Sequence, residues 1–203
     1  MLHRNFMDIL TGIYERGMYV EEINTNGYFL RQGVLDQMKE RGIRPLMKIS
    51  FDGIGHHDWL RGRKGAEEDA IRAIRLCRAN DFPVMIQTNV HRHNLDTLLE
   101  TAKLMDSLGV WKMRIIRTSE APRWKENAGD AALGLTEYYD RMLEFASAYM
   151  KTGCRMDVII WQLFASVSCI WQLWDDSCFV PGKGIQGFAS SMQGGQRHGG
   201  SCC

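Results

Sequence analysis

Hydrophobic side chains follow two alternating patterns along most of this chain, one typical of amphipathic helices and one typical of short buried strands. In the first pattern they recur three or four positions apart and fall on one helical face, as Ile9, Leu10 and Ile13 do. In the second they form short runs that end at polar turns, as 45–51 does. The predicted helices are 5–16, 31–41, 66–79, 95–108 and about 133–151. The predicted strands are 18–23, 45–51, 83–90, 112–117 and 156–161.

This alternation of strands and helices predicts an α/β fold. Successive β then α units connect by right-handed crossovers into a parallel sheet, which is either open or closed into a barrel. The chain begins with a helix, 5–16, of the kind that follows a strand, so we expect it to start partway through the fold. From Pro181 onward Gly, Ser and Gln dominate without periodicity, and we expect a poorly ordered tail there.

Composition and charge exclude several classes of protein. The 203 residues are 45% hydrophobic and 24% charged, which provides enough apolar material for one sizeable core. The 25 Lys and Arg residues balance 24 Asp and Glu residues, so no strong field favours nucleic acid or a membrane surface as a partner. No apolar run approaches the roughly 20 residues that span a membrane, and the first residues lack the apolar core of a secretory signal. We therefore expect a cytoplasmic protein.

Polar side chains concentrate where three of the predicted strands end. These ends are 25–27 (Thr-Asn-Gly), 50–53 (Ser-Phe-Asp-Gly) and 87–89 (Gln-Thr-Asn). The carboxyl ends of parallel strands meet at one edge of a sheet, where α/β proteins bind their ligands. Short hydroxyl and amide groups at this edge suit a polar ligand with ribose and amino acid moieties. Each of them is also a common turn-former or helix cap.

Four motifs in order give the chain a more definite resemblance. They are Thr25-Asn26-Gly27, then Ser50-Phe51-Asp52-Gly53, then His57-Asp58-Trp59-Leu60-Arg61-Gly62, then Gln87-Thr88-Asn89-Val90. In this order and at this spacing they resemble the middle of the barrel of radical S-adenosylmethionine (SAM) enzymes, in particular the SPASM-containing peptide and sulfatase maturases. The resemblance covers about residues 2–118 and continues more weakly to about Gly184. It implies a partial (β/α) barrel of parallel strands that lacks the first strands.

The resemblance also implies which residues bind SAM. Ser50 and Arg61 match positions that hold the methionyl carboxylate. An arginine suits a carboxylate because two of its N–H donors meet two oxygens. The other matched positions, which line the cofactor cleft, the sugar and the adenosine in turn, are Thr25, Asn26 and Gly27, then Asp52 and Gly53, then Thr88 and Asn89.

The cluster-binding signature of these enzymes is absent from the sequence. Radical SAM enzymes carry three cysteines spaced C-x-x-x-C-x-x-C, which hold three irons of a [4Fe–4S] cluster while SAM chelates the fourth. No triplet of this spacing occurs here, nor does the glycine-rich GGEP turn. The resemblance therefore implies an N-terminally truncated chain, which we expect not to cleave SAM by itself. It implies a full-length parent that modifies a peptide or protein side chain through a 5′-deoxyadenosyl radical.

The six cysteines fall into two groups. Cys77 and Cys154 lie in patterns typical of ordinary buried elements. The other four, which crowd into the end of the chain, are Cys169, Cys178, Cys202 and Cys203. Such crowding favours a metal site over a disulfide framework in a reducing compartment.

The end of the chain has a resemblance of its own. Cys169 and Cys178 precede Gly182-Lys183-Gly184, a pattern similar to the opening of a SPASM region, in which cysteines bind auxiliary iron–sulfur clusters. The resemblance divides the chain into 1–152, a partial radical SAM barrel, and 153–203, an extension similar to the start of a SPASM region.

Two other hypotheses stay open. His91 and His93 lie two positions apart at a strand end, which places both imidazoles on one face, and 56–58 (His-His-Asp) offers further ligands. This pattern predicts a divalent-metal-dependent hydrolase with a metal-bound hydroxide as nucleophile, for which Glu120 is the candidate carboxylate at a later strand end. The remaining hypothesis is a noncatalytic barrel fragment with an exposed sheet edge.

Overall fold

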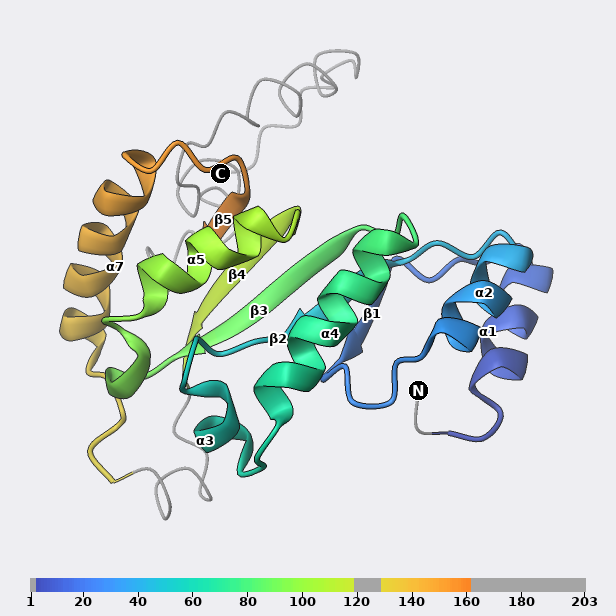
Figure 1. The fold of residues 1–203 in the computed structure, drawn as a ribbon, viewed down its shortest axis with the longest axis horizontal. Coiled ribbons are helices and arrows are strands. Elements are labelled where there is room, and N and C mark those ends of the chain that lie inside the picture. Colours follow the sequence, from blue (N-terminus) through green and yellow to red (C-terminus); the bar gives the residue numbers. More distant parts are fainter. Residues whose placement is uncertain (1–2, 119–128, 162–203) are drawn as a thin grey trace, which may run out of the picture.

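The computed structural model describes residues 3–118 and 129–161, which build one parallel sheet flanked by helices (Figure 1). Within these ranges the sheet has five strands in the order β1-β2-β3-β4-β5, and every neighbouring pair is parallel. The strands are β1 (Glu22–Thr25), β2 (Leu46–Ser50), β3 (Val84–Val90), β4 (Lys112–Arg117) and β5 (Asp157–Ile160). The predicted α/β fold with parallel strands is confirmed, and its described part is an open sheet.

The helices follow the predicted hydrophobic periodicity, with one addition. They are α1 (Phe6–Glu15), α2 (Gln32–Glu40), α3 (His57–Arg61), α4 (Ala66–Ala79), α5 (Leu98–Ser107) and α7 (Leu135–Met150). A short 3₁₀ turn, η1 (Arg92–Asn94), follows β3. Helix α3 was not predicted, because its five residues are too few for a helical periodicity to show in the sequence.

Two predicted boundaries are wrong for identifiable reasons. β1 begins at Glu22 rather than Met18, since pairing with β2 starts at Glu22; Met18 and Tyr19 are 54% and 78% exposed. The helix after β3 was expected to begin at residue 95, directly after Asn94. Instead Asn94 ends η1 and the helix begins at Leu98, because the Asn94 side chain turns inward and donates to backbone carbonyl oxygens at the end of the sheet.

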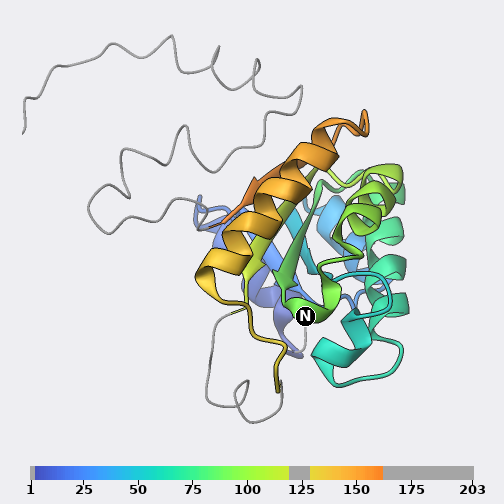
Figure 2. The ribbon, with the colours of Figure 1, turned by 90° about the vertical axis from the view of Figure 1, so that its left-hand side faces the viewer.

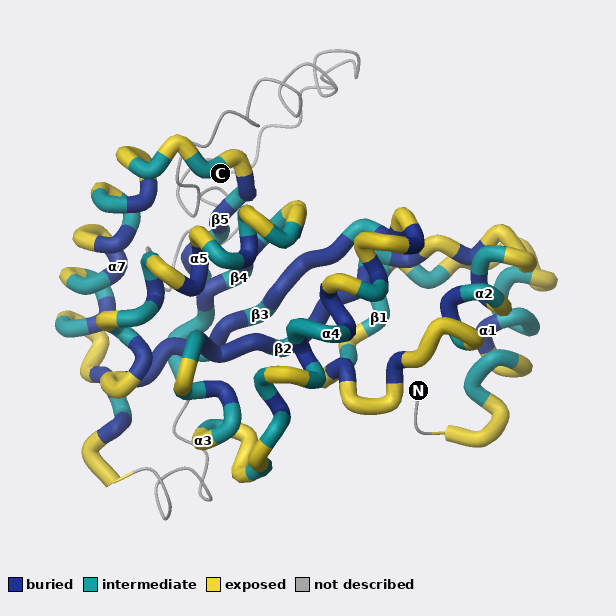
Figure 3. Tube along the Cα trace, in the orientation of Figure 1, coloured by how far each residue is buried: buried dark blue, intermediate teal, exposed yellow. Residues whose placement is uncertain are grey.

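The hydrophobic core lies between the sheet and the helices, to which α2, α4, α5 and α7 all contribute buried side chains. Most of the buried side chains of α4 are small, which lets the helix lie close to the sheet; Ala70, Ala73 and Cys77 are fully buried, as is the larger Ile74. Figure 2 shows α4 and α5 along one side of the sheet, and Figure 3 shows β2 and β3 as buried through most of their length. Parallel strands that are covered by helices are expected to be this apolar.

Successive side chains of a strand point to opposite faces, so the sheet has a second face turned away from α4 and α5. In β3 the fully buried Ile86 faces the helices, while Gln87 and Asn89 face the other way and are partly exposed. The register carries this alternation across the neighbouring strands. We call the second face the polar face; its members used below are Lys48, Ser50, Gln87, Asn89, Lys112 and Arg114.

The predicted division of the chain at residue 152 stays a prediction. β5, which lies in the predicted extension, pairs with β4 and is part of the sheet. Cys169, Cys178 and the predicted tail from Pro181 lie outside the described residues. Among the helices of residues 3–118 and 129–161, none has the length and apolar character needed to cross a membrane.

Candidate cofactor-binding site

The carboxyl ends of β1, β2 and β3 lie side by side at one edge of the sheet. The register places Thr25 opposite Ile49, so the turn after β1 lies beside the end of β2. It also places Ser50 opposite Gln87, and Thr88 is the next residue of β3. The three polar strand ends that the sequence singled out therefore lie together. We call this region the carboxyl edge.

The carboxylate of Asp52 is the centre of the carboxyl edge. Asp52 is fully buried, yet both of its oxygens have partners. Its Oδ2 accepts from Arg61 Nε at 2.8 Å and Nη2 at 2.7 Å and lies 2.9 Å from Nδ1 of His57. Its Oδ1 accepts from the backbone N and the side-chain Nδ2 of Asn89, at 3.0 and 3.1 Å. This one carboxylate therefore joins the turn after β2, helix α3 and the end of β3.

These partners hold Asp52 in its charged form. Burial by itself raises the pKa of the Asp52 carboxyl group, but the hydrogen bond from His57, the charge of Arg61 and the backbone N–H of Asn89 outweigh it, so the pKa lies below its usual value. Nδ1 of His57 also lies 3.0 Å from the backbone N of Asp52. A protonated Nδ1 cannot accept from that N–H, and the adjacent carboxylate favours the tautomer in which Nδ1–H donates to Oδ2.

His57 is enclosed at the bottom of this network. Its ring is fully buried and stacks on Phe51, with the ring centroids 5.4 Å apart. Nε2 of His57 is buried and has no hydrogen-bond partner among the described residues. The His57 ring therefore holds the Asp52 carboxylate from the buried side, and the partly exposed Arg61 side chain binds the same oxygen.

Asn94 locks the end of β2 to the end of β3. Its Nδ2 donates to the backbone carbonyl oxygens of Asp52 and Asn89, and its Oδ1 accepts from the backbone N of His91 at 3.0 Å. The side chain is fully buried. The sequence did not reveal this role, because an asparagine just after a strand is equally typical of a helix cap.

Thr88 and Gly53 lie inside the edge rather than on its surface. The hydroxyl of Thr88 donates to the carbonyl oxygen of Phe51 at 2.7 Å, and the residue is fully buried. Gly53 has a φ of +120°, a value that disfavours any side chain. Ser50, at the end of β2, is partly exposed on the polar face. Of these three residues, Ser50 is the one that is not buried.

The turn after β1 is packed tightly against α4. Gly27 has a φ of +79°, and a Cβ built on it would lie 2.8 Å from the Cβ of Ala73. Inside the turn, the Thr25 hydroxyl accepts from the backbone N of Gly27 at 3.1 Å, and Oδ1 of Asn26 accepts from the backbone N of Tyr28 at 3.2 Å. A glycine is therefore required where the turn meets the helix. Asn26 is exposed, and it follows Thr25, which the register places opposite Ile49, the residue before Ser50.

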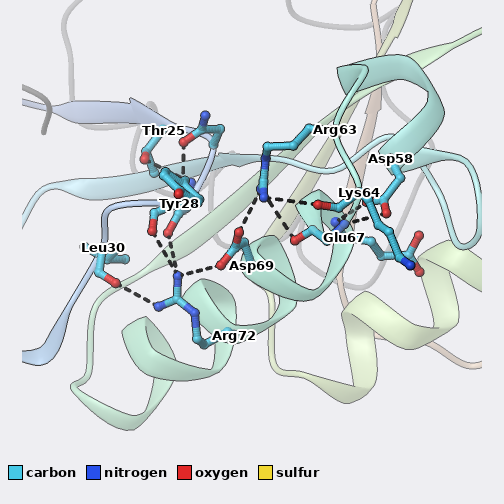
Figure 4. A network of polar contacts seen from close by, with 12 residues as sticks. Thr25, Tyr28, Leu30, Asp58, Arg63, Lys64, Glu67, Asp69 and Arg72 are labelled. Carbon is cyan, nitrogen blue, oxygen red and sulfur yellow. Dashed lines mark hydrogen bonds and ion pairs between the residues drawn. The ribbon is translucent and has the colours of Figure 1, made fainter.

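Two arginines fasten this turn to α4, as Figure 4 shows. Arg72 donates to the carbonyl oxygens of Leu30 at 2.8 Å and Tyr28 at 3.2 Å, and it also bonds to Asp69 at 3.1 Å. Arg63 bonds to Asp69 at 2.7 Å, and its guanidinium carbon lies 4.6 Å from the centre of the Tyr28 ring. The backbone of the turn is thus held against α4, in addition to the hydrogen bonds that Thr25 and Asn26 accept within the turn.

The adjacent residues His57 and Asp58 have different tasks. His57 points inward to Asp52, whereas Asp58 accepts from the backbone N of Gly65 at 2.7 Å and of Glu67 at 2.8 Å. Those backbone hydrogen bonds, from Glu67 first and then Gly65, lower the pKa of the Asp58 carboxyl group. Asp58 therefore caps the start of α4 and so fixes the helix against which the turn after β1 packs.

The histidines after β3, His91 and His93, lie near one another and near His56. The ring centroids of His91 and His93 are 5.7 Å apart, and those of His91 and His56 are 6.4 Å apart. Burial, followed by the charge of His93, lowers the pKa of His91 to about 4. Within residues 3–118 and 129–161, no group of three or more His, Cys, Asp or Glu is arranged to hold a metal ion. Glu120, the candidate carboxylate, lies outside these ranges, so the hydrolase hypothesis gains no support.

Comparison with known proteins gives relatives for part of the chain. No family model matches it. The AdoMet-dependent heme synthase of Methanosarcina barkeri is 34% identical over 87 residues, which is 42% of this chain and 25% of that protein. The sporulation killing factor maturation protein SkfB of Bacillus subtilis is 26% identical over 117 residues, which is 57% of this chain and 28% of that protein. The chain therefore spans about a quarter of the length of these curated relatives.

Solved structures share the fold over a larger part of the chain. A structure described as native anSMEcpe with bound AdoMet and Kp18Cys peptide has a TM-score of 0.61 at 14% identity, covering 77% of this chain and 46% of that one. Coproporphyrinogen III oxidase (HemN) from Escherichia coli, described as a radical SAM enzyme, has a TM-score of 0.60 at 13% identity, covering 75% and 38%. At these identities the likeness concerns the fold alone, and it agrees with the sequence relatives.

Proposed function

We propose that this chain, which resembles radical SAM enzymes in sequence and in fold, binds SAM at the carboxyl edge and belongs to an enzyme that modifies a peptide or protein. The observation that carries the proposal is the convergence of Asn26, Ser50 and Arg61 at one edge, with Arg61 fixed there by a buried carboxylate. An arginine held in one orientation binds a ligand carboxylate at a lower entropic cost than a mobile one.

The residues at the edge fit the amino acid part of SAM. One side of the Arg61 guanidinium, Nε and Nη2, faces Asp52, and no described residue accepts from Nη1. The remaining donors and the Ser50 hydroxyl are our candidates for the methionyl carboxylate. Asn26, with Thr25 and Gly27, would line the cleft beside it. The backbone beneath the sugar and adenosine would be held in place by hydrogen bonds and turn geometry at the ends of β2 and β3. The residues concerned are Asp52, Gly53, Thr88 and Asn89.

The described residues do not fit the [4Fe–4S] cluster that such enzymes use. Cys77 is fully buried within α4, and burial raises its pKa to about 12, so it does not supply a thiolate ligand. Cys154 is the other described cysteine, and the sequence has no C-x-x-x-C-x-x-C. For this chain we therefore propose SAM binding. Cleavage of SAM is a proposal for the whole protein, and so is an auxiliary cluster at Cys169 and Cys178 in a SPASM-like extension.

A peptide substrate is supported by the names of several similar proteins. SkfB is named as a maturation protein for a killing factor, another relative is named PqqA peptide cyclase, and anSMEcpe was solved with a peptide. In the whole protein, SAM together with a [4Fe–4S] cluster would supply the radical chemistry needed to modify an unactivated C–H bond. The part of this chain would be to orient SAM and to exclude water. We propose that the protein is located in the cytoplasm.

SAM binding by the purified full chain tests the proposal directly. In isothermal titration calorimetry we expect SAM to bind, and Arg61→Ala to weaken the affinity by roughly tenfold or more through loss of a charge-assisted hydrogen bond. Arg75→Ala is the matched control, because Arg75 is exposed on α4 and its substitution removes the same charge. The proposal fails if SAM does not bind, or if Arg61→Ala and Arg75→Ala weaken binding equally.

A further inference from the structure

The polar face carries three cations, and two of them have acidic neighbours. Lys48 is largely buried and forms an ion pair with Glu22. Lys112 lies opposite Asp157 in the register of β4 and β5. Lys48 therefore has a carboxylate partner, and Lys112 has an aspartate opposite it on the next strand and lies 4.2 Å from the centre of the Trp111 ring.

Arg114, the third cation, has no such neighbour. The register places it between Gln87 of β3 and Ile159 of β5, which carry no charge. Within residues 3–118 and 129–161, Arg114 forms no ion pair, and its buried Nε has no hydrogen-bond partner. The charge of Arg114 contributes to a lowered pKa of Glu22, but the hydrogen bond from Lys48 is the larger cause, and Glu22 is bound to that lysine.

An arginine in this position is costly for the fold unless an anion reaches it. A half-buried guanidinium has lost part of its hydration, and an N–H group without an acceptor leaves that loss uncompensated. Trp161 offsets part of the loss, since the guanidinium carbon lies 5.2 Å from the centre of its ring. A ring contact of this kind also holds the guanidinium plane in place. It does not satisfy the N–H donors.

The surroundings of Arg114 suit a carboxylate. Gln87 and then Ser50 follow it across the sheet in the same row of the polar face, so an amide and a hydroxyl stand beside the cation. Ser50 is also at the carboxyl edge, where we place SAM. A group bound by Arg114 on β4 would therefore lie two strands away from Ser50 on β2, on the same face of the sheet.

We propose that Arg114 binds a carboxylate of the substrate, so that the polar face selects an acidic peptide. The identification of the substrate as a peptide rests on the proposed function, whereas the need of Arg114 for an anion rests on its own surroundings. A planar guanidinium supplies paired N–H donors that match the two oxygens of a carboxylate. A peptide whose glutamate is replaced by glutamine lacks this match and is bound more weakly.

The test is a titration of the full chain, labelled with ¹⁵N, with two neutral-capped tripeptides, Gly-Glu-Gly and Gly-Gln-Gly. The Arg114 Nε–H signal is assigned by its disappearance in Arg114→Gln. We expect the acidic peptide to shift this signal and to bind at least roughly tenfold more weakly to Arg114→Gln. Arg114→Lys, which keeps the charge without the paired donors, should lose part of the affinity. Arg75→Gln, on the opposite side of the sheet, should lose none.

Several outcomes overturn the proposal. It is wrong if both peptides bind alike, or if Arg75→Gln weakens the acidic peptide as much as Arg114→Gln does. It is also wrong if a porphyrin tetracarboxylate shifts the Arg114 signal while the acidic peptide does not, because the carboxylate then belongs to another class of substrate. SAM is titrated separately into the same variants. Loss of SAM affinity in Arg114→Gln would assign Arg114 to the cofactor and overturn the proposal, whereas failure of SAM to bind any variant counts against the proposed function alone.

Discussion

Asp52 illustrates how far the role of a single residue can be predicted from the sequence. The S-x-DG motif located it at the carboxyl edge beside the expected cofactor site. In the structure its carboxylate is fully buried and binds Arg61, His57 and Asn89 of the chain itself. The position followed from strand periodicity and turn residues, but the partners did not, because they depend on how α3 folds back over the strand end.

The first prediction concerns the charge of Asp52. Asp52→Asn keeps the shape of the side chain but removes the negative charge of the carboxylate that accepts from Arg61 and His57. We therefore expect the free energy of unfolding at neutral pH to fall by roughly 2 kcal/mol. Urea denaturation measures it. Asp140→Asn, at an exposed position on α7, is the control and should leave stability unchanged within about 0.5 kcal/mol.

The same variant changes the response of stability to acid. The folded-state pKa of Asp52 lies below the ordinary value of 3.8, so its contribution is fully present above that pH and is lost as the pH falls through the folded-state pKa. Wild type and Asp140→Asn should therefore lose stability more steeply than Asp52→Asn below about pH 4. If the free energy of unfolding depends on pH in the same way for all three proteins, the charged form of Asp52 is not stabilised by these contacts.

At the level of elements, the sequence predicted what periodicity encodes and missed what contacts decide. Long helices such as α4 and α7 and buried strands such as β3 carry enough residues to show their period. The start of β1 was misplaced because β1 pairs with β2 alone among the described strands, so apolar residues before Glu22 gain no partner. Helix α3 was missed because it spans only His57–Arg61 and depends on its contact with Asp52.

The second prediction concerns the contact between the turn after β1 and α4. Gly27→Ala combines a positive φ with a Cβ only 2.8 Å from the Cβ of Ala73, so we expect it to lower the free energy of unfolding by roughly 3 kcal/mol. Gly17→Ala also has a positive φ, of +72°, but open space around it, and should cost only about 1 kcal/mol.

A third glycine separates strain from the general effect of adding a methyl group. Gly33 lies in α2 with open space around it and no positive φ, so Gly33→Ala should stabilise the chain by about 0.5 kcal/mol. Thermal and urea unfolding of the three variants measure the series. Equal effects of Gly27→Ala and Gly17→Ala would mean that the turn moves away from α4 at little cost, and that its position does not depend on the packing described above.

At the scale of the whole molecule, the carboxyl edge is assembled from segments that are far apart in the sequence. The turn after β1, the turn after β2 and the end of β3 meet because parallel pairing aligns their strands, and Asn94 and Arg72 tie them to each other and to α4. The motif order predicted that these segments belong together. It gave no information about Arg114, whose importance appears only when the charges of the polar face are paired across strands.

This assembly leads to the last prediction, which concerns how SAM affects the molecule as a whole. A ligand that contacts all three segments binds the folded state and not the unfolded chain, so SAM at about 100 times its dissociation constant should stabilise the fold by roughly 2.7 kcal/mol. Hydrogen exchange should slow together in the backbone at 25–30, 51–57 and 89–94, because a ligand spanning the edge suppresses their separate openings. Arg61→Ala at the same SAM concentration should show neither effect. Protection confined to one of the three segments would mean that SAM binds elsewhere, since a cofactor at a shared edge cannot order one side of it without the others.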